Sequence, residues 1–160
     1  MVKAKQEPDH PGVLAPPPLI FGVPLVAGLL FHIFVGGDSL GLPGLLRWPV
    51  GFVFIMGGLA IIGLAIERFL RAQTNPEPWK PATTVVADGI FARTRNPMYL
   101  GMAIAYLGAA FAAGSALALV LLVPTLILMD RGVIAREERY MERKFGEDYV
   151  RYKRSVRRWL

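Results

Sequence analysis

The chain has 160 residues, of which 54% are hydrophobic, and its mean hydropathy is +0.43. These values exceed those of typical soluble domains, so we interpret the chain as an integral membrane protein. It contains no cysteine and only two histidines far apart in the sequence, which excludes disulfides and gives no pattern for a metal site. The net charge of +6 is explained by membrane topology and by attraction to anionic membrane lipids, so we expect no nucleic-acid partner.

The N-terminal part of the sequence divides into a tail and a first apolar segment. Residues 1–18 are rich in proline and polar residues, which predicts a disordered tail. We expect one domain over residues 19–160. Its first apolar segment, residues 19–35, lacks a clear cleavage site with small residues, so we expect a retained membrane anchor and not a signal peptide.

Three further apolar segments follow at residues 48–66, 98–113 and 116–129. The first two of the four segments approach the roughly 20 residues that a membrane span requires. The last two are shorter and are separated only by the Gly-Ser pair 114–115, which predicts a tight helical hairpin. Three alternatives stay open for this hairpin: a full span with snorkelling ends, a hairpin that stops short of the far surface, or a second arm that continues past Asp130.

Lys and Arg are unevenly distributed around these segments. Segment 68–95 is rich in them, and so is the tail after Met129, whereas the loop over residues 36–47 has only Arg47. The positive-inside rule therefore predicts that both termini and segment 68–95 lie in the cytoplasm.

Small residues recur along the second and third apolar segments. In the third segment they lie three and four residues apart, which lets another helix approach closely. We interpret both sets as helix-packing surfaces; the alternative is that they leave room for a ligand against bare backbone. The residues are Gly51, Gly57, Gly58 and Gly63 in the second segment, and Gly101, Ala105, Gly108 and Ala112 in the third.

The third apolar segment has a helix-starting signal. Asn96 is a favoured N-cap residue, and Pro97 suits the first helical position because its missing N–H would be unpaired there anyway. The positive end of this helix lies beside Arg95, with Arg93 nearby, which predicts an anion site at the membrane surface. The alternative is that these arginines snorkel to lipid phosphates.

The tail contains a second helix, over residues 133–145. Helical spacing places Ile134, Met141 and Phe145 on one face, and three arginines lie roughly opposite. Glu137 and Glu138 straddle the apolar face, which indicates a partner with positive charge or hydrogen-bond donors. The alternative is pairing with Arg131, Arg95 or a neighbouring lysine. The fold class is thus an all-α integral membrane protein with about four transmembrane helices and a C-terminal cytoplasmic amphipathic helix.

Two stretches together resemble a known family. "GIFARTRNPMYLG" at residues 89–101 and "REERYMERKFGEDYVRYKRSV" at residues 136–156 are similar to the isoprenylcysteine carboxyl methyltransferase family and, more distantly, to the phospholipid N-methyltransferases. The resemblance covers about residues 48–160. It implies a small membrane methyltransferase that holds S-adenosylmethionine at the cytoplasmic face with the last hairpin, the preceding loop and the tail helix.

The resemblance also implies roles for individual residues. Where the family has a substrate-contacting arginine this chain has Val133, so we expect Arg131 or Arg136 to take that role. Arg95 is expected to hold the carboxylate of the cofactor. Asn96 stands where the family usually has histidine; it keeps capping and donor functions but cannot titrate. The cofactor contacts implied by position are Thr83, Thr84, Val85, Val86, Phe91, Asn96, Pro97, Met98, Tyr99, Glu137 and Glu138.

The resulting hypothesis is S-adenosylmethionine-dependent methylation of a lipophilic acceptor, either a lipid or a lipidated small molecule or peptide. A carboxylate acceptor is favoured because it is already ionised and needs no general base. The alternatives are phospholipid N-methylation, a membrane reductase that uses NADPH, and a non-enzymatic scaffold whose glycine-rich faces bind partner helices.

Overall fold

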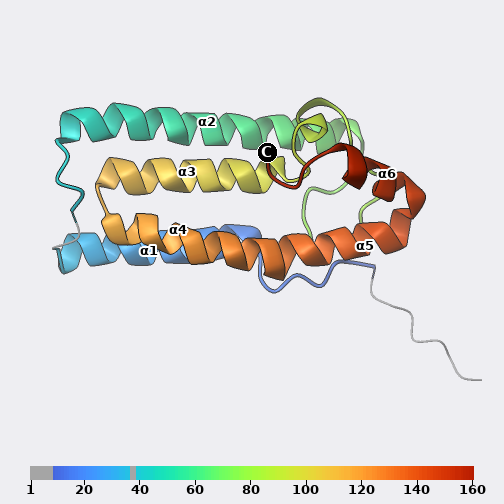
Figure 1. Ribbon diagram of the computed structural model, residues 1–160, viewed down its shortest axis with the longest axis horizontal. Helices are drawn as coiled ribbons and strands as arrows, with labels where there is room; N and C mark the ends of the chain where they lie inside the picture. Colours follow the sequence, from blue (N-terminus) through green and yellow to red (C-terminus); the bar gives the residue numbers. More distant parts are fainter. Residues whose placement is uncertain (1–8, 37–38) are drawn as a thin grey trace, which may run out of the picture.

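The structure is a computed structural model that describes residues 9–36 and 39–160. Within these residues the chain is helical and contains no strand; only one isolated bridge pairs Ser39 with Ser115. The helices run in the order α1 (Pro17–Phe34), α2 (Gly44–Arg71), the 3-10 helix η1 (Gly89–Ala92), α3 (Pro97–Ala113), α4 (Ala116–Met129), the π-helix η2 (Asp130–Ile134), α5 (Ala135–Phe145) and α6 (Glu147–Ser155) (Figure 1).

Three helices in the described part of the chain are long and apolar enough to cross a membrane. They are α1, α2 and the continuous helix Ala116–Phe145, which joins α4 to α5 through η2. The second arm of the hairpin therefore continues past Asp130, as the third alternative had it. The shorter α3 is also apolar. The described residues confirm an all-α fold with three helices that are long and apolar enough to cross a membrane, whereas a fourth span and the cytoplasmic position of the tail helices stay predictions.

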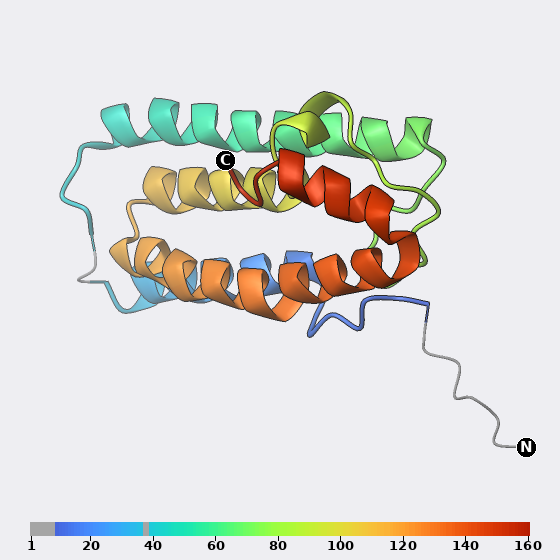
Figure 2. The same ribbon diagram turned by 45° about the vertical axis from the view of Figure 1, so that its right-hand side comes forward.

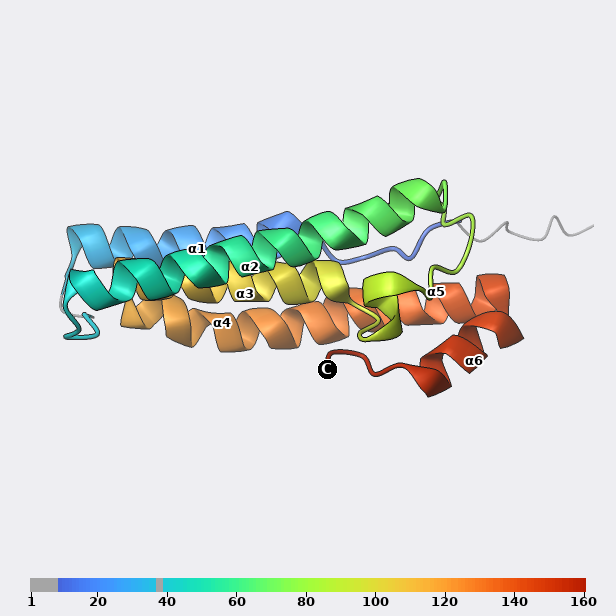
Figure 3. The same cartoon turned by 90° about the horizontal axis from the view of Figure 1, so that it is seen from above.

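The four apolar helices run side by side along the long axis of the molecule (Figures 1 and 3). Helix α2 packs on α3, and α1 packs on α4. One end of the bundle carries only the connections from α1 to α2 and from α3 to α4. The other end carries the loop with η1, together with α5 and α6 (Figure 2). The segments rich in Lys and Arg thus gather at one end.

Helices α2 and α3 are held at backbone contact by their glycines. A Cβ atom at Gly58 would lie 2.4 Å from the carbonyl oxygen of Gly101, and one at Gly108 would lie 2.6 Å from that of Gly51. No side chain fits at such distances. The packing interpretation of the small residues is confirmed along this contact, which leaves no room for a ligand. Gly57, by contrast, has no described neighbour within 4 Å of such a Cβ.

The hairpin between α3 and α4 is closed by specific polar contacts. Gly114 adopts the left-handed conformation, with φ of 79°, that ends many helices. Arg47 donates from Nη1 to the carbonyl of Ala113 at 2.7 Å, which satisfies a free carbonyl at the end of α3. The side chain of Ser115 accepts from the N–H of Ala118 and so caps the start of α4.

The N-terminal segment differs from the expected disordered tail. Residues 9–16 run along η2 and α5, where Leu14 donates its N–H to the carbonyl of Gly132 at 3.3 Å. Arg136 donates to the carbonyl of Gly12 at 2.7 Å. Helix α1 then begins at Pro17, before the expected end of the tail. Residues 1–8, to which the same expectation applied, lie outside the described residues.

Candidate active site

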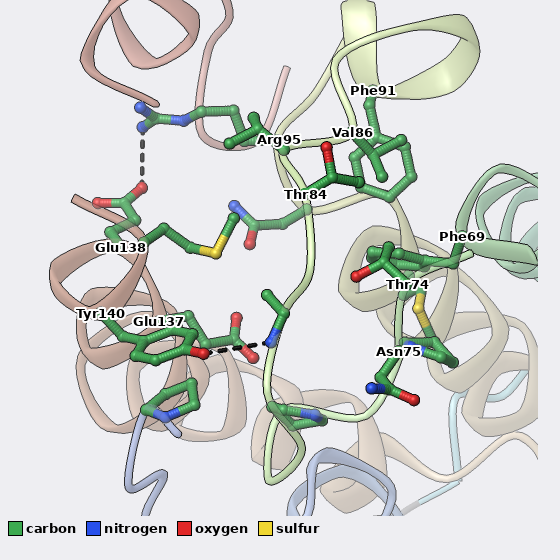
Figure 4. Close-up of a pocket in the computed structure, with 18 of the residues that line it drawn as sticks. Phe69, Thr74, Asn75, Thr84, Val86, Phe91, Arg95, Glu137, Glu138 and Tyr140 are labelled. Atoms are coloured by element: carbon green, nitrogen blue, oxygen red, sulfur yellow. Dashed lines mark hydrogen bonds and ion pairs between the residues drawn. The ribbon is translucent and has the colours of Figure 1, made fainter. Parts of the chain in front are cut away.

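A pocket lies at the end of the bundle where the loop after α2 meets the start of α3, helix α5 and helix α6 (Figure 4). It encloses about 860 Å³ of empty space, the open solvent at its mouth included. Its walls come from segments far apart in the sequence, including Pro11 of the N-terminal segment, Phe69 of α2 and Met141 of α5.

The start of α3 forms one wall. The helix begins at Pro97 as predicted, and the carbonyl of Asn96 accepts from the N–H of Leu100 at 3.0 Å. The side chain of Asn96 does not cap the helix, however, so that part of the prediction is wrong. Its amide instead donates to the carbonyl of Arg158 at 2.8 Å, because the C-terminal segment crosses this entrance. The side chain of Thr94 accepts from the N–H of Asn96 at 3.2 Å.

Arg95 is buried against α5. Only 8% of its side chain is exposed, which excludes snorkelling to lipid phosphates. Its Nη2 lies 2.9 Å from Oε1 of Glu138, and its Nη1 donates to the carbonyl of Lys153 at 3.1 Å. Among the described residues, its buried Nε has no hydrogen-bond partner. Arg95 therefore lines the pocket but is largely committed to holding α5 and α6.

Glu138 accepts from a second arginine as well. Arg158 donates from Nε to Oε1 of Glu138 at 3.1 Å and from Nη2 to Oε2 at 2.6 Å. Only 6% of the Glu138 side chain is exposed. For this residue the alternative of pairing with a neighbouring basic residue, Arg95 in particular, is thus confirmed. Arg158 was not anticipated, because no local pattern connects the end of the chain to α5.

Glu137 has different surroundings from its neighbour. It points from α5 into the space between this helix and the loop, whereas Glu138 points to Arg95 (Figure 4). The buried hydroxyl of Tyr99 donates to its carboxylate. Within residues 9–36 and 39–160, no arginine, lysine or histidine forms an ion pair with it. A half-buried carboxylate that forms no ion pair is suited to a positively charged ligand.

Aromatic side chains form the other walls. Phe91 of η1 meets Phe69 edge to face, with ring centroids 5.1 Å apart. Tyr149 and Tyr152 of α6 meet in the same way at 6.0 Å, and the hydroxyl of Tyr152 donates to the carbonyl of Phe91 at 2.8 Å. Burial raises the pKa of both tyrosines, so their hydroxyls stay neutral at physiological pH. These tyrosines were not predicted as site residues, although the spacing in "GEDYVRY" was visible.

The loop between α2 and η1 contributes three of its four predicted residues. Thr84, Val85 and Val86 line the pocket. Thr83 does not; its N–H donates to the side chain of Thr74 at 3.0 Å and its hydroxyl donates to the carbonyl of Gln73 at 3.2 Å. These hydrogen bonds hold the start of the loop. Thr83 does not line the pocket in which the other predicted cofactor residues of this loop lie.

The two arginines predicted to contact substrate also lie outside this pocket. Arg136 is held by the N-terminal segment. Arg131 is exposed and lines a second hollow, between α3 and α4, whose other lining residues are Leu100, Ala103, Leu126, Ile127, Asp130 and Trp159. The structure brings together all the predicted cofactor residues except Thr83, together with Arg95: Thr84, Val85, Val86, Phe91, Asn96, Pro97, Met98, Tyr99, Glu137 and Glu138.

Comparison with known proteins agrees with the resemblance drawn from the sequence. The family model described as "Phospholipid methyltransferase" matches residues 46–148, which include every pocket wall except the N-terminal segment and the α6 residues Tyr149 and Tyr152. The chain is 27% identical over 148 residues to the protein-S-isoprenylcysteine O-methyltransferase of Schizosaccharomyces pombe, and the match covers 82% of this chain and 63% of that protein.

A second relative, an uncharacterized protein of Haemophilus influenzae, is 41% identical over 63 residues, which are 39% of this chain and its own full length. No solved structure matches the chain. The family match extends over well more than half of the sequence and contains the start of α3 and the two glutamates. The chain therefore belongs to the phospholipid methyltransferase family.

Proposed function

We propose that this protein is a multi-pass membrane methyltransferase that uses S-adenosylmethionine to methylate a lipophilic acceptor at the cytoplasmic face. The observation that carries the proposal is the half-buried carboxylate of Glu137, which forms no ion pair within the described residues and lies in a pocket with aromatic walls. The ion-pair partners of Glu138 neutralise that neighbouring acid, and Glu77 is paired with Lys80 at 2.8 Å. Glu137 is thus the lining charge that stays available to a ligand.

The lining residues fit the chemistry of this cofactor. Its sulfonium and ammonium groups are cations, which suit the carboxylate of Glu137 and the faces of Tyr99 and Tyr149. Its adenine suits apolar walls such as Phe91 and Met141. Its carboxylate suits the positive end of α3 and the unused Nε donor of Arg95.

S-adenosylmethionine, when bound, would supply an electrophilic methyl group. The contribution of the chain is then position, exclusion of water and charge. Tyr99 and α5 fix the carboxylate of Glu137, and Tyr149 and Tyr152 close the pocket against solvent. Methyl transfer is a displacement in which charge is dispersed, so alignment and partial desolvation account for much of the acceleration.

We propose a carboxylate as the accepting group. No histidine lines the pocket among the described residues, and the other acids there are ion-paired, so Glu137 is left as the single possible base. An ionised carboxylate needs none. Arg131 stays the candidate for a contact with the acceptor away from its reacting carboxylate, because it lies beside the second hollow, whose largely apolar lining suits a lipid chain. Phospholipid N-methylation is the second candidate, favoured by the description of the matching family model.

The scaffold hypothesis keeps only part of the observation that suggested it. Glycines such as Gly58 and Gly108 are used in the contact between α2 and α3, whereas Gly57 and Gly63 have no described neighbour within 4 Å of an added Cβ. The NADPH hypothesis is tested together with the preferred one below.

Titration calorimetry on the full chain in detergent tests the cofactor. We expect S-adenosylmethionine and its demethylated product to bind and NADPH not to bind. Glu137→Ala should abolish binding of S-adenosylmethionine, because it removes the only unpaired lining carboxylate. Glu147→Ala, which removes an exposed acid at the start of α6, is the matched control and should bind like the wild type. Wild-type affinity in Glu137→Ala would overturn the assignment.

The acceptor is tested with membranes from cells that express the chain and with S-adenosylmethionine labelled in its methyl group. A methyl ester releases labelled methanol on mild alkaline treatment, whereas an N-methyl group does not. We expect the labelled lipid-soluble product to be alkali-labile. A stable label in a phospholipid headgroup would establish the second candidate instead.

A further inference from the structure

We propose that Arg158 is a positioning residue that fixes the shape of the pocket without lining it. This inference rests on the proposed function of the pocket as a cofactor site. Arg158 lies after α6, outside residues 46–148 that match the family. It is nevertheless the residue at which the two sides of the pocket are joined.

The side chain of Arg158 holds the side of the pocket formed by η2 and α5. Its Nε and Nη2 form a fork on the carboxylate of Glu138, and its Nη1 lies 3.1 Å and 3.0 Å from the two carboxylate oxygens of Asp130. Asp130 is the first residue of η2, where the long helix changes its winding. Nε1 of Trp159 also donates a hydrogen bond to Oδ1 of Asp130, at 3.2 Å. Arg158 thus spans the point at which α4 turns into α5.

The backbone of Arg158 holds the opposite side of the pocket, which is the start of α3. Its carbonyl accepts from the side-chain amide of Asn96 at 2.8 Å and from the hydroxyl of Thr94 at 3.2 Å. Both donors are buried. The preceding carbonyl, that of Arg157, accepts from the N–H of Arg95 at 3.0 Å. One residue of the tail therefore ties the α3 entrance to an acid of η2 and an acid of α5.

The network also decides which acid faces the ligand. Arg95, Glu138, Arg158 and Asp130 form a chain of alternating charges whose sum is zero. Glu137 lies outside it. Without Arg158, Glu138 would keep Arg95 and a weaker contact with Lys153, whose Nζ is 3.8 Å from Oε2. The α5 turn that carries both acids would then lose its bidentate anchor.

The substitution Arg158→Ala separates positioning from simple charge. Removing a positive charge near the pocket would, by electrostatics alone, favour a cationic ligand. Loss of positioning acts in the opposite direction and does not depend on ligand charge. We therefore expect Arg158→Ala to weaken binding of both S-adenosylmethionine and its demethylated product by about tenfold or more.

Arg157→Ala is the matched control. It removes the same charge from the adjacent position, its side chain is exposed, and its backbone carbonyl is retained. We expect it to bind both ligands like the wild type. Arg158→Lys keeps the charge but loses the fork, so we expect an intermediate affinity. Binding is measured on the full chain in detergent, below the melting temperature of each variant.

The proposal is overturned if Arg158→Ala binds as the wild type does, if Arg157→Ala loses as much affinity, or if the loss is confined to one of the two ligands. Should Arg158→Ala not fold, Arg158→Lys and Asp130→Asn carry the test, and both must weaken binding. If the wild type binds neither ligand, the proposed function fails. The positioning role of Arg158 is then judged by the melting temperatures of Arg158→Ala, Glu138→Gln and their double variant. The decreases in melting temperature caused by the two substitutions must be non-additive.

Discussion

Glu137 and Glu138 are adjacent on α5, and their positions differ by about 100° around the helix. That rotation aims one carboxylate at the guanidinium groups of Arg95 and Arg158 and the other at the hydroxyl of Tyr99. The first acid is neutralised by ion pairs and stabilises the structure. The second forms no ion pair within the described residues and is suited to a cationic ligand.

This division of roles predicts opposite effects from two similar substitutions. Glu138→Ala should lower the free energy of unfolding by about 3 kcal/mol or more, because it leaves the buried guanidinium of Arg95 without a counter-charge. Glu137→Ala should change that free energy much less, since it removes no ion pair. Unfolding by SDS in mixed micelles measures both. Equal unfolding midpoints for the two variants would contradict the assignment.

The sequence alone predicts much of this site but not its electrostatics. Helical spacing places both glutamates toward the apolar face of α5, and the Asn96–Pro97 pair marks the start of α3. The second partner of Glu138 could not be predicted, because Arg158 is 20 residues away and belongs to no repeating pattern. The side chain of Asn96 was misassigned for the same reason: a tail from the end of the chain supplies its acceptor.

The helices are easier to predict than the contacts between them. Hydropathy identifies the four apolar segments, and the spacing of small residues identifies the face of α3 that packs on α2. The π-helix Asp130–Ile134 leaves no mark in the hydrophobic pattern, which explains why the continuation of α4 into α5 stayed one of several alternatives. Individual glycines of α2 could not be sorted into contact and non-contact positions either.

Two adjacent glycines of α2 give a direct test of the helix contact. Gly58→Ala should destabilise the chain by about 1–3 kcal/mol, because its Cβ would lie 2.4 Å from one backbone atom and 2.7 Å from another, the N of Ala105. Gly57→Ala meets nothing within 4 Å and should be neutral or slightly stabilising, since alanine favours the helix. Unfolding midpoints in SDS compare the two. Similar midpoints would show that α2 and α3 are not held at backbone contact.

At the scale of the whole molecule, the bundle has two unlike ends. The pocket, α5, α6 and the described N-terminal segment share one end with most of the arginines and lysines (Figures 1 and 2). The opposite end has short connections and the half-buried Arg47, which is used to close the α3–α4 hairpin. The charge asymmetry of the sequence is thus an asymmetry of the folded molecule, and the positive-inside rule predicts that the pocket end faces the cytoplasm.

The absence of cysteine from the chain makes this orientation simple to measure. Ser39→Cys places one thiol at the end remote from the pocket, and Ser155→Cys places one at the end of α6; both serines are exposed. A membrane-impermeant maleimide should label Ser39→Cys in intact cells and Ser155→Cys only after the membrane is opened, because the reagent cannot reach the cytoplasm. The unmodified chain, which has no thiol, is the control. The reverse pattern would place the pocket outside the cytoplasm, and labelling of both variants in intact cells would mean that the two ends of the bundle are not separated by a membrane.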